Sequence, residues 1–522
     1  MQKASILMPL YPGMRVNEKV VTGAINQTID DIEILVLDQR PEAERDDIAI
    51  FSSNPRIVYV AKTFKNDAAL YNYAFSLAKS SYLITLPKNI EYLPNTVELF
   101  RNKLIADPKL AMVYGDYTQI NADGKKEEKP MFEYIGDITE RANFGHVRMF
   151  RLKAVFEVGG CDEQFNFMAE YDLRLKLDDN YTFARIAQPS YIYKVADDTP
   201  KRAAIVSKLH TTEEGKFGVF SYMFLDKDKE VEIEKAFENM LRRRGAYLYH
   251  EPQVVQYPKG KKWPVLVSVI IPCYNRGAFV GKAIQSVFRQ TFQDFEIIVV
   301  DNGSTDNSIK VVEELMKKDK RITLIKNKVN VIAVSLNKGL RAAKGKYYAQ
   351  LDSDDEYAPI CLEKMVDYLE THPTAAETIS YYELIDENSQ PIKELGIIKH
   401  LEYDRNNILR VDGAGALRVY HRAVILDEFG GFDETEFGHF GEDYDMNLKI
   451  SEKYDIGKVY DVCYYYRRHP DNTDVKRDPW FKLRNKTLAR QHCLVRRTKL
   501  NQQLQKQQAA KSKKSKTTKR NK

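Results

Sequence analysis

Apolar residues along the chain gather in short continuous runs that alternate with segments of helical spacing. The runs with the length of buried strands are at residues 266–271, 296–300, 322–325 and 347–351. The segments with helical spacing lie between them, at residues 279–288, 306–316 and 332–343. This alternation predicts βαβ units, a mostly parallel sheet covered on both faces, and ligands bound at the carboxyl ends of the strands.

The same pattern occurs twice in the chain. SILMPLYP at residues 5–12 matches SVIIPCYN at 268–275, and QTIDDIEILVLD at 27–38 matches QTFQDFEIIVVD at 290–301, both with an offset of 263 residues. Three further blocks match in the same order, beginning at Leu70 and Leu336, at Asp107 and His372, and at Val158 and Phe429. Five matched blocks in one order predict a duplicated α/β domain.

The duplication divides the chain into four expected parts. We predict one α/β domain at residues 1–200, a charged helical connector at 201–262, a second α/β domain at 263–476, and a basic tail at 477–522 that is helical or disordered. The final segment, KSKKSKTTKRNK, has low complexity, and we expect it to be disordered.

The net charge of the chain is unevenly distributed, because the basic residues concentrate in the tail. From Phe481 to the end there are 15 Lys and Arg and no Asp or Glu, so the net charge of +6 splits into +15 for this segment and −9 for the rest. Such a tail is either a solubilising extension or a segment attracted to anionic lipid or another polyanion. We expect no nucleic-acid binding, because no aromatic residue follows Phe481 for base stacking.

The composition is that of a soluble globular protein, with 43% hydrophobic and 30% charged residues. No apolar run approaches the ~18 residues of a membrane span, and the N-terminus lacks a signal-peptide cleavage pattern. The five cysteines form no CxxC pattern, which fits a reducing compartment and predicts neither disulfides nor a zinc site. We expect a cytoplasmic protein, with the inner face of the membrane as an alternative location and with an oligomer as an open alternative to a monomer.

Three carboxylates follow the predicted strand 347–351. Asp352, Asp354 and Asp355 surround Ser353, and like charges this close repel one another unless a cation lies among them. Oxygen ligands suit Mg²⁺ or Mn²⁺. An acidic turn before a helix would have the same residues, but the position at the carboxyl end of a strand favours a metal site.

Two other predicted strands end in polar loops at the same edge. Their loop residues are Pro272, Cys273, Tyr274 and Asn275 after the first strand, and Asp301, Asn302, Gly303 and Ser304 after the second. Such groups can hold a nucleoside, and Tyr274 could lie against its base or ribose. The alternatives are a packing role for Tyr274 and ordinary turn chemistry for Gly303 and Ser304.

Two later motifs supply further polar groups. GEDYDMNL opens an amphipathic helix with Glu442 and Asp443 in its first turn, where a helix stabilises ionised carboxylates. Asp443 fits either a cap or a base that deprotonates an acceptor hydroxyl. YYRRHP follows an aromatic strand and contains His469, which is either structural or a further metal or phosphate contact.

Together these motifs resemble the inverting family 2 glycosyltransferases of GT-A fold. The motifs that carry the resemblance, in the family's order, are PCYN, VVDNGSTDNS, QLDSDDEYAP, GGFDE, GEDYDMNL and YYRRHPDNT. The resemblance implies two tandem GT-A-like domains. It also implies metal-dependent transfer of a sugar from a nucleotide-sugar donor to a glycan, polymer or lipid-linked acceptor.

The resemblance implies roles for individual residues. Asp352 and Asp354 would form the metal-binding DxD motif, with Asp355 near the metal. His469 would contact the metal or the diphosphate, and Asp443 would be the catalytic base, with Glu442 beside it. The residues expected to bind the donor are Pro272, Tyr274, Asn275, Asp301, Asn302, Asn337 and Ser353.

Two departures bear on the donor. Uridine-using relatives often carry a second acid where this chain has Asn302, and an arginine where it has Leu336. A UDP-sugar is our first expectation, and dTDP- and GDP-sugars are the alternatives.

The first copy lacks the acidic loop. An offset of 265 residues places the segment Pro87, Lys88, Asn89 and Ile90 under residues 352–355. An offset of 273 places Glu170 under Asp443 and Ala196 under His469. We predict that this copy does not catalyse transfer and instead holds the acceptor, extends its groove or makes an oligomer contact. The alternative is a bifunctional enzyme.

The sequence differs from that expected for two other classes of protein. A nucleotidyltransferase normally has a Gly-rich loop with Arg and Lys after its first strand, where this chain has PCYNRGAF. A non-catalytic glycan-binding scaffold would be favoured if both acidic loops were degenerate, but the second one is intact.

Overall fold

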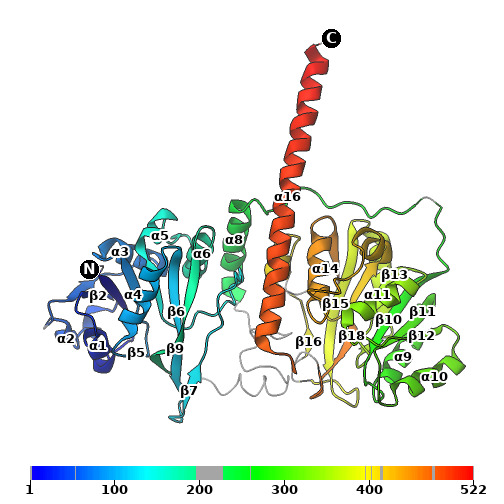
Figure 1. The fold of residues 1–522 in the computed structure, drawn as a ribbon, viewed down its shortest axis with the longest axis horizontal. Helices are drawn as coiled ribbons and strands as arrows, with labels where there is room; N and C mark the ends of the chain where they lie inside the picture. The colour runs from blue at the N-terminus through cyan, green and yellow to red at the C-terminus, as the bar shows by residue number, and fades with distance from the viewer. Residues whose placement is uncertain are drawn as a thin grey trace. The chain divides into compact units, whose positions relative to one another are not determined.

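The structure is a computed structural model that describes residues 3–52, 54–195, 227–258, 260–393, 396–400, 402–411, 415–472 and 476–520. It has two compact units, one formed by Met1–Pro200 with Asp226–Met240 and the other containing Leu241–Lys522 (Figure 1). Ala196, which the repeat aligns with His469, lies outside the described residues.

The described part of the first unit contains one nine-stranded sheet. Its strands are β1 Ala4–Leu10, β2 Ile32–Asp38, β3 Ile57–Ala61, β4 Tyr82–Thr85, β5 Ile90–Tyr92, β6 Leu110–Ile120, β7 Lys126–Lys129, β8 Arg148–Arg151 and β9 Thr182–Lys194. Its helices are α1 Glu18–Ile25, the 3₁₀ turn η1 Glu42–Glu44, α2 Ala49–Ser52, α3 Asp67–Leu77, α4 Thr96–Ala106, α5 Leu152–Glu157 and α6 Ala169–Leu177. Helix α8, Lys227–Arg243, begins within the predicted connector.

The described part of the second unit also contains one nine-stranded sheet. Its strands are β10 Val265–Cys273, β11 Phe295–Asp301, β12 Ile322–Lys326, β13 Gly345–Gln350, β14 Glu356–Tyr357, β15 Ala375–Ile385, β16 Ile397–Ile398, β17 Arg418–His421 and β18 Asp455–Arg467. Its helices are α9 Val280–Phe288, α10 Ser308–Lys318, α11 Ile332–Ala342, α12 Cys361–Thr371, α13 Ile408–Val411, the π-helix η3 Val424–Glu428, α14 Glu442–Ser451 and α16 Pro479–Arg520.

The two sheets have the same strand order. It is β3-β2-β1-β4-β8-β6-β9-β5 in the first unit and β12-β11-β10-β13-β17-β15-β18-β14 in the second, so each strand has a counterpart nine numbers later. The registers agree as well, because Leu10 pairs with Asp38 and Cys273 pairs with Asp301, 263 residues further on. The predicted α/β class with two tandem domains is confirmed, although each sheet is mixed, since β8 and β17 run antiparallel to their neighbours.

Apolar runs fix the layers of the second unit. Strand β11, FEIIVVD, is buried at every position, as expected for a parallel strand covered on both faces. Helices α9, α10 and α12 pack in the core on one face, and α11 and α14 pack in the core on the other. This arrangement leaves the carboxyl ends of β10, β11 and β13 for the polar loops.

The C-terminal segment is more structured than its composition suggests. Ala489, Cys493 and Arg497 of α16 are fully buried, and Arg497 donates to the hydroxyl of Ser451 at the end of α14 at 2.9 Å. The final segment, expected to be disordered, is helical to Arg520, because Lys, Gln and Ala favour helix and no Gly or Pro interrupts them. No helix in the described parts of the chain has an apolar stretch long enough to cross a bilayer.

Candidate active site

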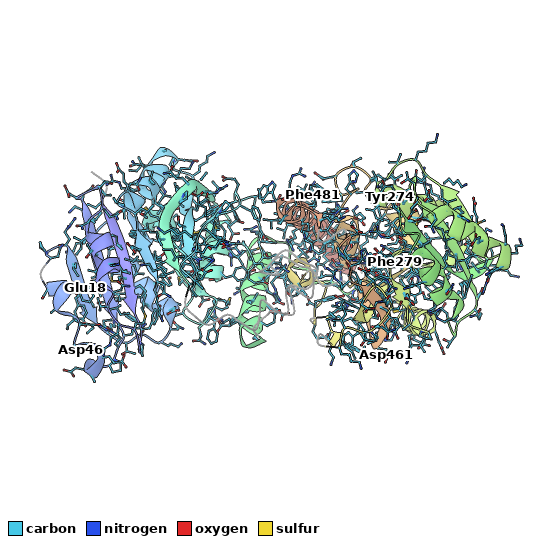
Figure 2. The ribbon with its side chains drawn as sticks, turned by 90° about the horizontal axis from the view of Figure 1, so that it is seen from below. Glu18, Asp46, Tyr274, Phe279, Asp461 and Phe481 are labelled. Atoms are coloured by element: carbon cyan, nitrogen blue, oxygen red, sulfur yellow. The ribbon has the colours of Figure 1, made fainter. Side chains whose placement is uncertain are left out.

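A cavity of about 440 Å³ opens at the carboxyl ends of β10, β11 and β13 in the second unit. The predicted site residues that line it are Pro272, Tyr274, Asn302, Asp352, Ser353, Asp354, Asp355, Glu442 and Asp443. Those that lie outside its lining are Asn275, Asp301, Asn337 and His469. Figure 2 marks Tyr274, which is 42% exposed, and Phe279 on this unit.

The acidic loop is closed on itself directly after β13. The backbone N–H of Asp355 donates to the carbonyl oxygen of Asp352 at 3.1 Å. The hydroxyl of Tyr357, on the next strand, donates to the carbonyl oxygen of Gln350 at 2.6 Å. The loop therefore presents its carboxylates at the sheet edge, where the sequence predicts them.

Asp354 is held by two cationic or polar partners. The Arg276 Nε lies 2.9 Å from Asp354 Oδ2, and the His469 Nε2 lies 3.1 Å from the same oxygen. Burial raises the pKa of Asp354, but the His469 hydrogen bond and the Arg276 charge lower it below its usual value. The His469 ring stacks on Phe279, with ring centroids 5.1 Å apart. His469 therefore reaches the acidic loop from the end of β18.

Asp352 lacks such a partner. Its closest side-chain contact is the Gln350 amide, 3.3 Å from Oδ1. Burial, and then the charge of Asp354, raise its pKa to about 6. The negative charge of this pair is therefore incompletely compensated by the protein.

This charge fits a divalent cation that is shared with a ligand. Among the described residues, no three His, Cys, Asp or Glu side chains converge as in a preformed metal site. Mg²⁺ usually binds through one or two carboxylates together with substrate phosphates rather than in an all-protein cage. The Asp352–Asp354 pair fits that second arrangement.

Asp355 has a different environment. Its Oδ1 accepts from the backbone N–H of Arg467 at 2.7 Å, and its Oδ2 accepts from the hydroxyl of Tyr464 at 2.7 Å. Burial, and then the charges of Asp354 and Asp352, raise its pKa well above the usual value. Both oxygens serve to fasten the acidic loop to β18.

The residues that we expect to bind the nucleoside form hydrogen bonds within two loops. Asp301 accepts from the backbone N–H of Gly303 at 3.1 Å, and Asn275 accepts from that of Thr305 at 2.8 Å. Asn302 accepts from the Asn327 amide at 3.1 Å while still lining the cavity. Tyr274 remains exposed for stacking.

Asn337 has a structural environment rather than a place in the cavity. Its amide nitrogen donates to the carbonyl oxygen of Phe432 at 2.8 Å, and its oxygen accepts from the Phe432 N–H at 2.8 Å. In the first unit, Asn72 makes the same pair of bonds with Cys161, both at 2.9 Å. This asparagine therefore holds the Gly-Gly turn in both units.

The predicted base, Asp443, lines the same cavity from helix α14. Helix α14 begins at Glu442 after Gly441, whose φ of 91° suits glycine. Asp443 Oδ2 lies 2.6 Å from Nη2 of Arg418 on β17. Burial, and then the charge of Asp443, raise the pKa of Glu442 to about 8.

The sequence reasoning missed several cations of the cavity. They are Arg276, Arg418 and Arg477. Arg276 follows the PCYN motif directly, so its position was a usable signal. Arg418 had none, because it meets Asp443 only through the pairing of β17 in the sheet.

The first unit keeps the framework of this loop without its acids. Tyr92 donates to the carbonyl oxygen of Thr85 at 2.6 Å, the counterpart of the Tyr357 bond. The same bond in both units supports the alignment of Pro87, Lys88 and Asn89 with residues 352–354. The loop of the first unit therefore has no carboxylate in these positions.

The nucleoside side of the first unit is also altered. Asp38, the counterpart of Asp301, is fully buried and lies 2.9 Å from Arg40 Nη2. Arg40 occupies the position of Gly303. By contrast, Glu170, the counterpart of Asp443, keeps an arginine partner, with Arg148 Nη1 at 2.9 Å.

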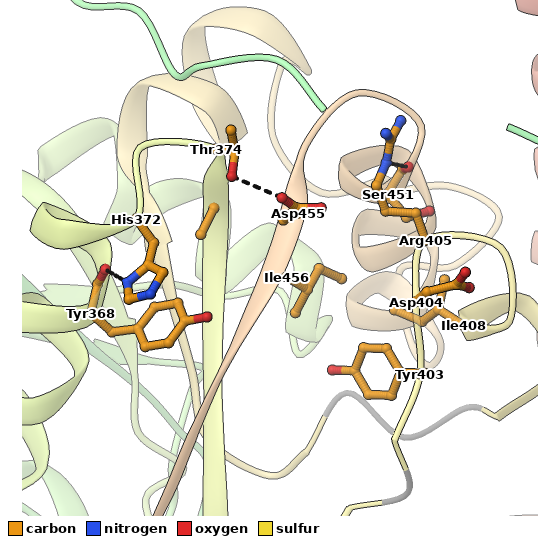
Figure 3. A pocket seen from close by; sticks show the side chains of 11 residues that line it. Tyr368, His372, Thr374, Tyr403, Asp404, Arg405, Ile408, Ser451, Asp455 and Ile456 are labelled. Carbon is orange, nitrogen blue, oxygen red and sulfur yellow. Dashed lines mark hydrogen bonds between the residues drawn. The ribbon is translucent and has the colours of Figure 1, made fainter. Parts of the chain in front are cut away.

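A second cavity of about 300 Å³ lies at the amino ends of β15 and β18, the edge opposite to the acidic loop (Figure 3). Thr374 donates to Asp455 at 2.8 Å, and Arg405 donates to the carbonyl oxygen of Ser451 at 2.9 Å. This cavity contains none of the predicted site residues.

Comparisons with known proteins show which family the chain is similar to. The model of glycosyl transferase family 2 matches residues 268–429. An uncharacterized glycosyltransferase of Haemophilus influenzae is 34% identical over 222 residues, which cover 40% of this chain and 67% of that protein. The chondroitin synthase of Escherichia coli is 24% identical over 523 residues, which cover 93% of this chain and 74% of that protein.

Among solved structures, the chain is similar to residues 1–349 of S. aureus TarS in complex with UDP-GlcNAc. The identity is 20% and the TM-score 0.35, and the match covers 41% of this chain and 61% of that one. The sequence match to the Haemophilus protein and the family match over the acidic loop establish the assignment. The chain belongs to glycosyl transferase family 2.

Proposed function

We propose that the second unit is a metal-dependent, inverting glycosyltransferase. It moves a sugar from a nucleotide-sugar donor, with UDP-sugars as the first choice, to a glycan, polymer or lipid-linked acceptor. One observation carries the proposal: the Asp352–Asp354 pair and the Asp443–Arg418 pair line the same cavity. Stabilisation of the donor's leaving group and removal of the acceptor's proton can therefore take place in one cavity.

The donor side uses the loops after β10 and β11. Tyr274 is exposed enough to stack on the base, and Asn302 lines the cavity between the loops. The diphosphate would lie near Arg276 and the acidic loop. A divalent cation held there by Asp352 and Asp354 would neutralise the negative charge of the leaving diphosphate.

The acceptor side uses α14. Arg418 holds Asp443 in one orientation. Asp443 then takes the proton of the acceptor hydroxyl as that oxygen attacks the anomeric carbon from the face opposite to the diphosphate. A single displacement of this kind inverts the anomeric configuration and needs no covalent enzyme intermediate.

Glu442 is suited to a supporting role. With its pKa raised to about 8, it is mostly protonated at neutral pH and cannot serve as the base there. A protonated carboxyl can instead donate a hydrogen bond within the cavity. This difference favours Asp443 over its neighbour as the base.

For the first unit we propose a non-catalytic role, with acceptor holding first and a groove extension or oligomer contact next. The absence of carboxylates at Pro87–Asn89 and the Arg40–Asp38 pair both support it. The retained Arg148–Glu170 pair favours the alternative, a bifunctional enzyme with a metal-independent first site. The match to a chondroitin synthase supports a polysaccharide as the acceptor.

A donor screen tests the proposal. Nucleotide release is measured with UDP-, dTDP- and GDP-sugars, with Mn²⁺, with Mg²⁺ and with EDTA, for the full chain and for Asp354→Ala. We expect release with one nucleotide class, dependent on the cation and lost in the variant. Full activity in EDTA would contradict the metal mechanism, and residual transfer in the variant would support an active first unit.

A further inference from the structure

A fully buried carboxyl group lies in the sheet behind the proposed base. Glu377 on β15 has 0% exposure. In the antiparallel pairing of β15 with β17, Glu377 faces Tyr420 and Ile379 faces Arg418. Residues two apart on a strand share a face, so Glu377 and Arg418 are diagonal neighbours on one face of the sheet.

Glu377 also binds helix α14, which lies beside β15 (Figure 1). The surroundings of Asn447 assign its amide orientation, because only with the nitrogen directed at β15 do both amide atoms find suitable partners. In that orientation the nitrogen donates to the two Glu377 oxygens at 3.0 and 2.9 Å. The same nitrogen lies 3.0 Å from the carbonyl oxygen of Asp443, one turn earlier. Glu377 therefore fastens to the sheet the turn of α14 that carries Asp443.

The charge of the arginine is set by the base rather than by the buried glutamate. Burial lowers the pKa of Arg418, but the charge of Asp443 raises it above its usual value. Burial raises the pKa of Glu377 well above its usual value, and the charge of Arg418 offsets this only in part. Burying a carboxyl group is costly unless its partners compensate.

The first unit shows that the fold does not need this carboxyl group. Met112 occupies the corresponding place, in the same pairing with β8 that Glu377 has with β17. Arg148 and Glu170 still form their ion pair there. A methionine at this site is therefore compatible with the strand pairing and with the arginine–carboxylate pair.

The helix contact differs too. Arg174 of α6 stands at the position of Asn447 and donates to the carbonyl oxygens of Asp137 and Thr139, both at 2.5 Å. In the first unit this helix position thus binds a buried loop, whereas in α14 it binds a strand of the sheet. The buried glutamate and its amide partner occur together in the unit with the acidic loop.

We propose that Glu377 is a positioning residue for Asp443. It neighbours the guanidinium that orients the base and binds the amide that fixes the turn bearing it. A displacement of the base by about 1 Å can lower the rate by roughly 10²-fold. This inference rests on the proposed function, in which Asp443 removes the acceptor proton.

The test is a double-mutant cycle in the full chain. Glu377→Met introduces the residue that the first unit has, Asp443→Asn removes the base, and the third variant carries both changes. Rates and donor KM are measured with the sugar nucleotide that the donor screen identifies. We expect Glu377→Met to lower kcat by roughly 10- to 100-fold with little change in donor KM. The double variant should be no slower than Asp443→Asn, because a positioning residue acts only through its base.

Glu296→Gln is the matched control. Glu296 is a buried glutamate of β11, which β10, β13 and β17 separate from β15 in the sheet, and it accepts from Ser268 and the Lys344 N–H, both at 2.7 Å. We expect a change in thermal stability there without a selective loss of kcat. If Glu377→Met folds poorly, Glu377→Gln enters the same cycle, and it should lose less activity because one oxygen still accepts from Asn447.

The outcomes separate the two proposals. An inactive Asp443→Asn with a fully active Glu377→Met overturns the positioning role alone. A further loss in the double variant, equal to the loss from Glu377→Met by itself, overturns it as well and indicates a general lesion. Wild-type kcat in Asp443→Asn overturns the base assignment and the positioning role together. A crystal structure of Glu377→Met should show the turn of α14 that bears Asp443 shifted away from β15, with the Arg418 pair retained as in the first unit; an unmoved turn counts against the inference.

Discussion

The sheets of the two units have the same strand order, and the units differ in the loop after the fourth strand. The bonds that hold the framework recur in both. Gln27 and Gln290 each donate to a backbone carbonyl across the unit, at 2.9 and 2.8 Å, and Glu33 and Glu296 each accept from a backbone N–H at 2.7 Å. Fold-determining contacts are therefore the same, while the carboxylates of the acidic loop occur only in the second unit.

This difference indicates that very few residue positions determine the chemistry of the cavity. The change from Asp354 to Asn89 and the change from Gly303 to Arg40 leave the strand register intact. Loops tolerate such changes more readily than the strands that they connect. Exchanging residues at these positions between the units tests which of them carry the chemistry of the site.

The largest effect is expected at the acidic loop. Asp354→Asn gives the second unit the residue of the first, and Asp352→Ala removes the other carboxylate. Either change should lower kcat by roughly 10³-fold or more, because the charge on the leaving diphosphate loses several kcal/mol of stabilisation. Steady-state kinetics with Mn²⁺ and Mg²⁺ measure the loss.

Asn89→Ala in the first unit is the control and should leave kcat unchanged. A large loss from this change would show that the first unit takes part in transfer. Thermal melts of all three variants establish that the framework is retained.

The second effect concerns the base. Asp443→Asn keeps the size of the side chain but cannot accept a proton at neutral pH, so kcat should fall by roughly 10²–10⁴-fold with donor KM nearly unchanged. Glu170→Gln makes the same change in the first unit and should leave kcat as it is. A collapse of donor binding in Asp443→Asn, with kcat maintained, would mean that Asp443 binds the donor instead.

The framework was predictable from sequence because its signals are local. Apolar runs mark the strands, and the constant offsets reveal the duplication, both of which the structure matches. The acidic loop was predictable for the same reason, since Asp352 and Asp354 directly follow a buried strand.

The rest depends on pairings that sequence spacing does not contain. Arg418 meets Asp443 because β17 lies beside β13 and β15, and Asn337 is fixed by a distant Gly-Gly turn. The bonds that both oxygens of Asp355 accept from β18 were likewise not contained in the spacing, and its place near a metal stays a prediction. Composition also hid the fact that the first half of α16 belongs to the core.

A smaller difference between the units is expected in how their stability depends on pH. Burial lowers the pKa of His421 to about 3, and Lys346 adds to the shift. The first unit has Arg151 at this position. Because the unfolded histidine binds a proton more readily than the folded one, the second unit should lose stability as pH falls below ~6.5.

The loss attributable to His421 should reach about 2 kcal/mol by pH 5. Urea unfolding of the wild type and of His421→Gln at pH 7 and pH 5 measures it. The variant should be less sensitive to acid, whatever its stability at pH 7. Equal pH slopes in the two proteins would refute a buried neutral histidine.

The smallest effect on catalysis is expected from the end of α16. A deletion from Pro479 would remove the buried Ala489 and Cys493 and should unfold the second unit. Deletion after Gln502 spares them, and it also spares Asn501, whose amide donates to the carbonyl oxygens of Gly245 and Tyr247 at 2.8 and 2.7 Å.

The segment beyond Gln502 contains eight Lys and Arg and no acid, so its attraction to an anionic surface is electrostatic and screened by salt. We expect the deletion to leave kcat unchanged and to reduce binding to phosphatidylglycerol vesicles, more at low salt than at high salt. A variant with these eight residues replaced by Gln keeps the length and should behave like the deletion. Vesicle binding that is unchanged in both proteins would identify the segment as a solubilising extension, and binding lost only in the deletion would assign the effect to the helix rather than to its charge.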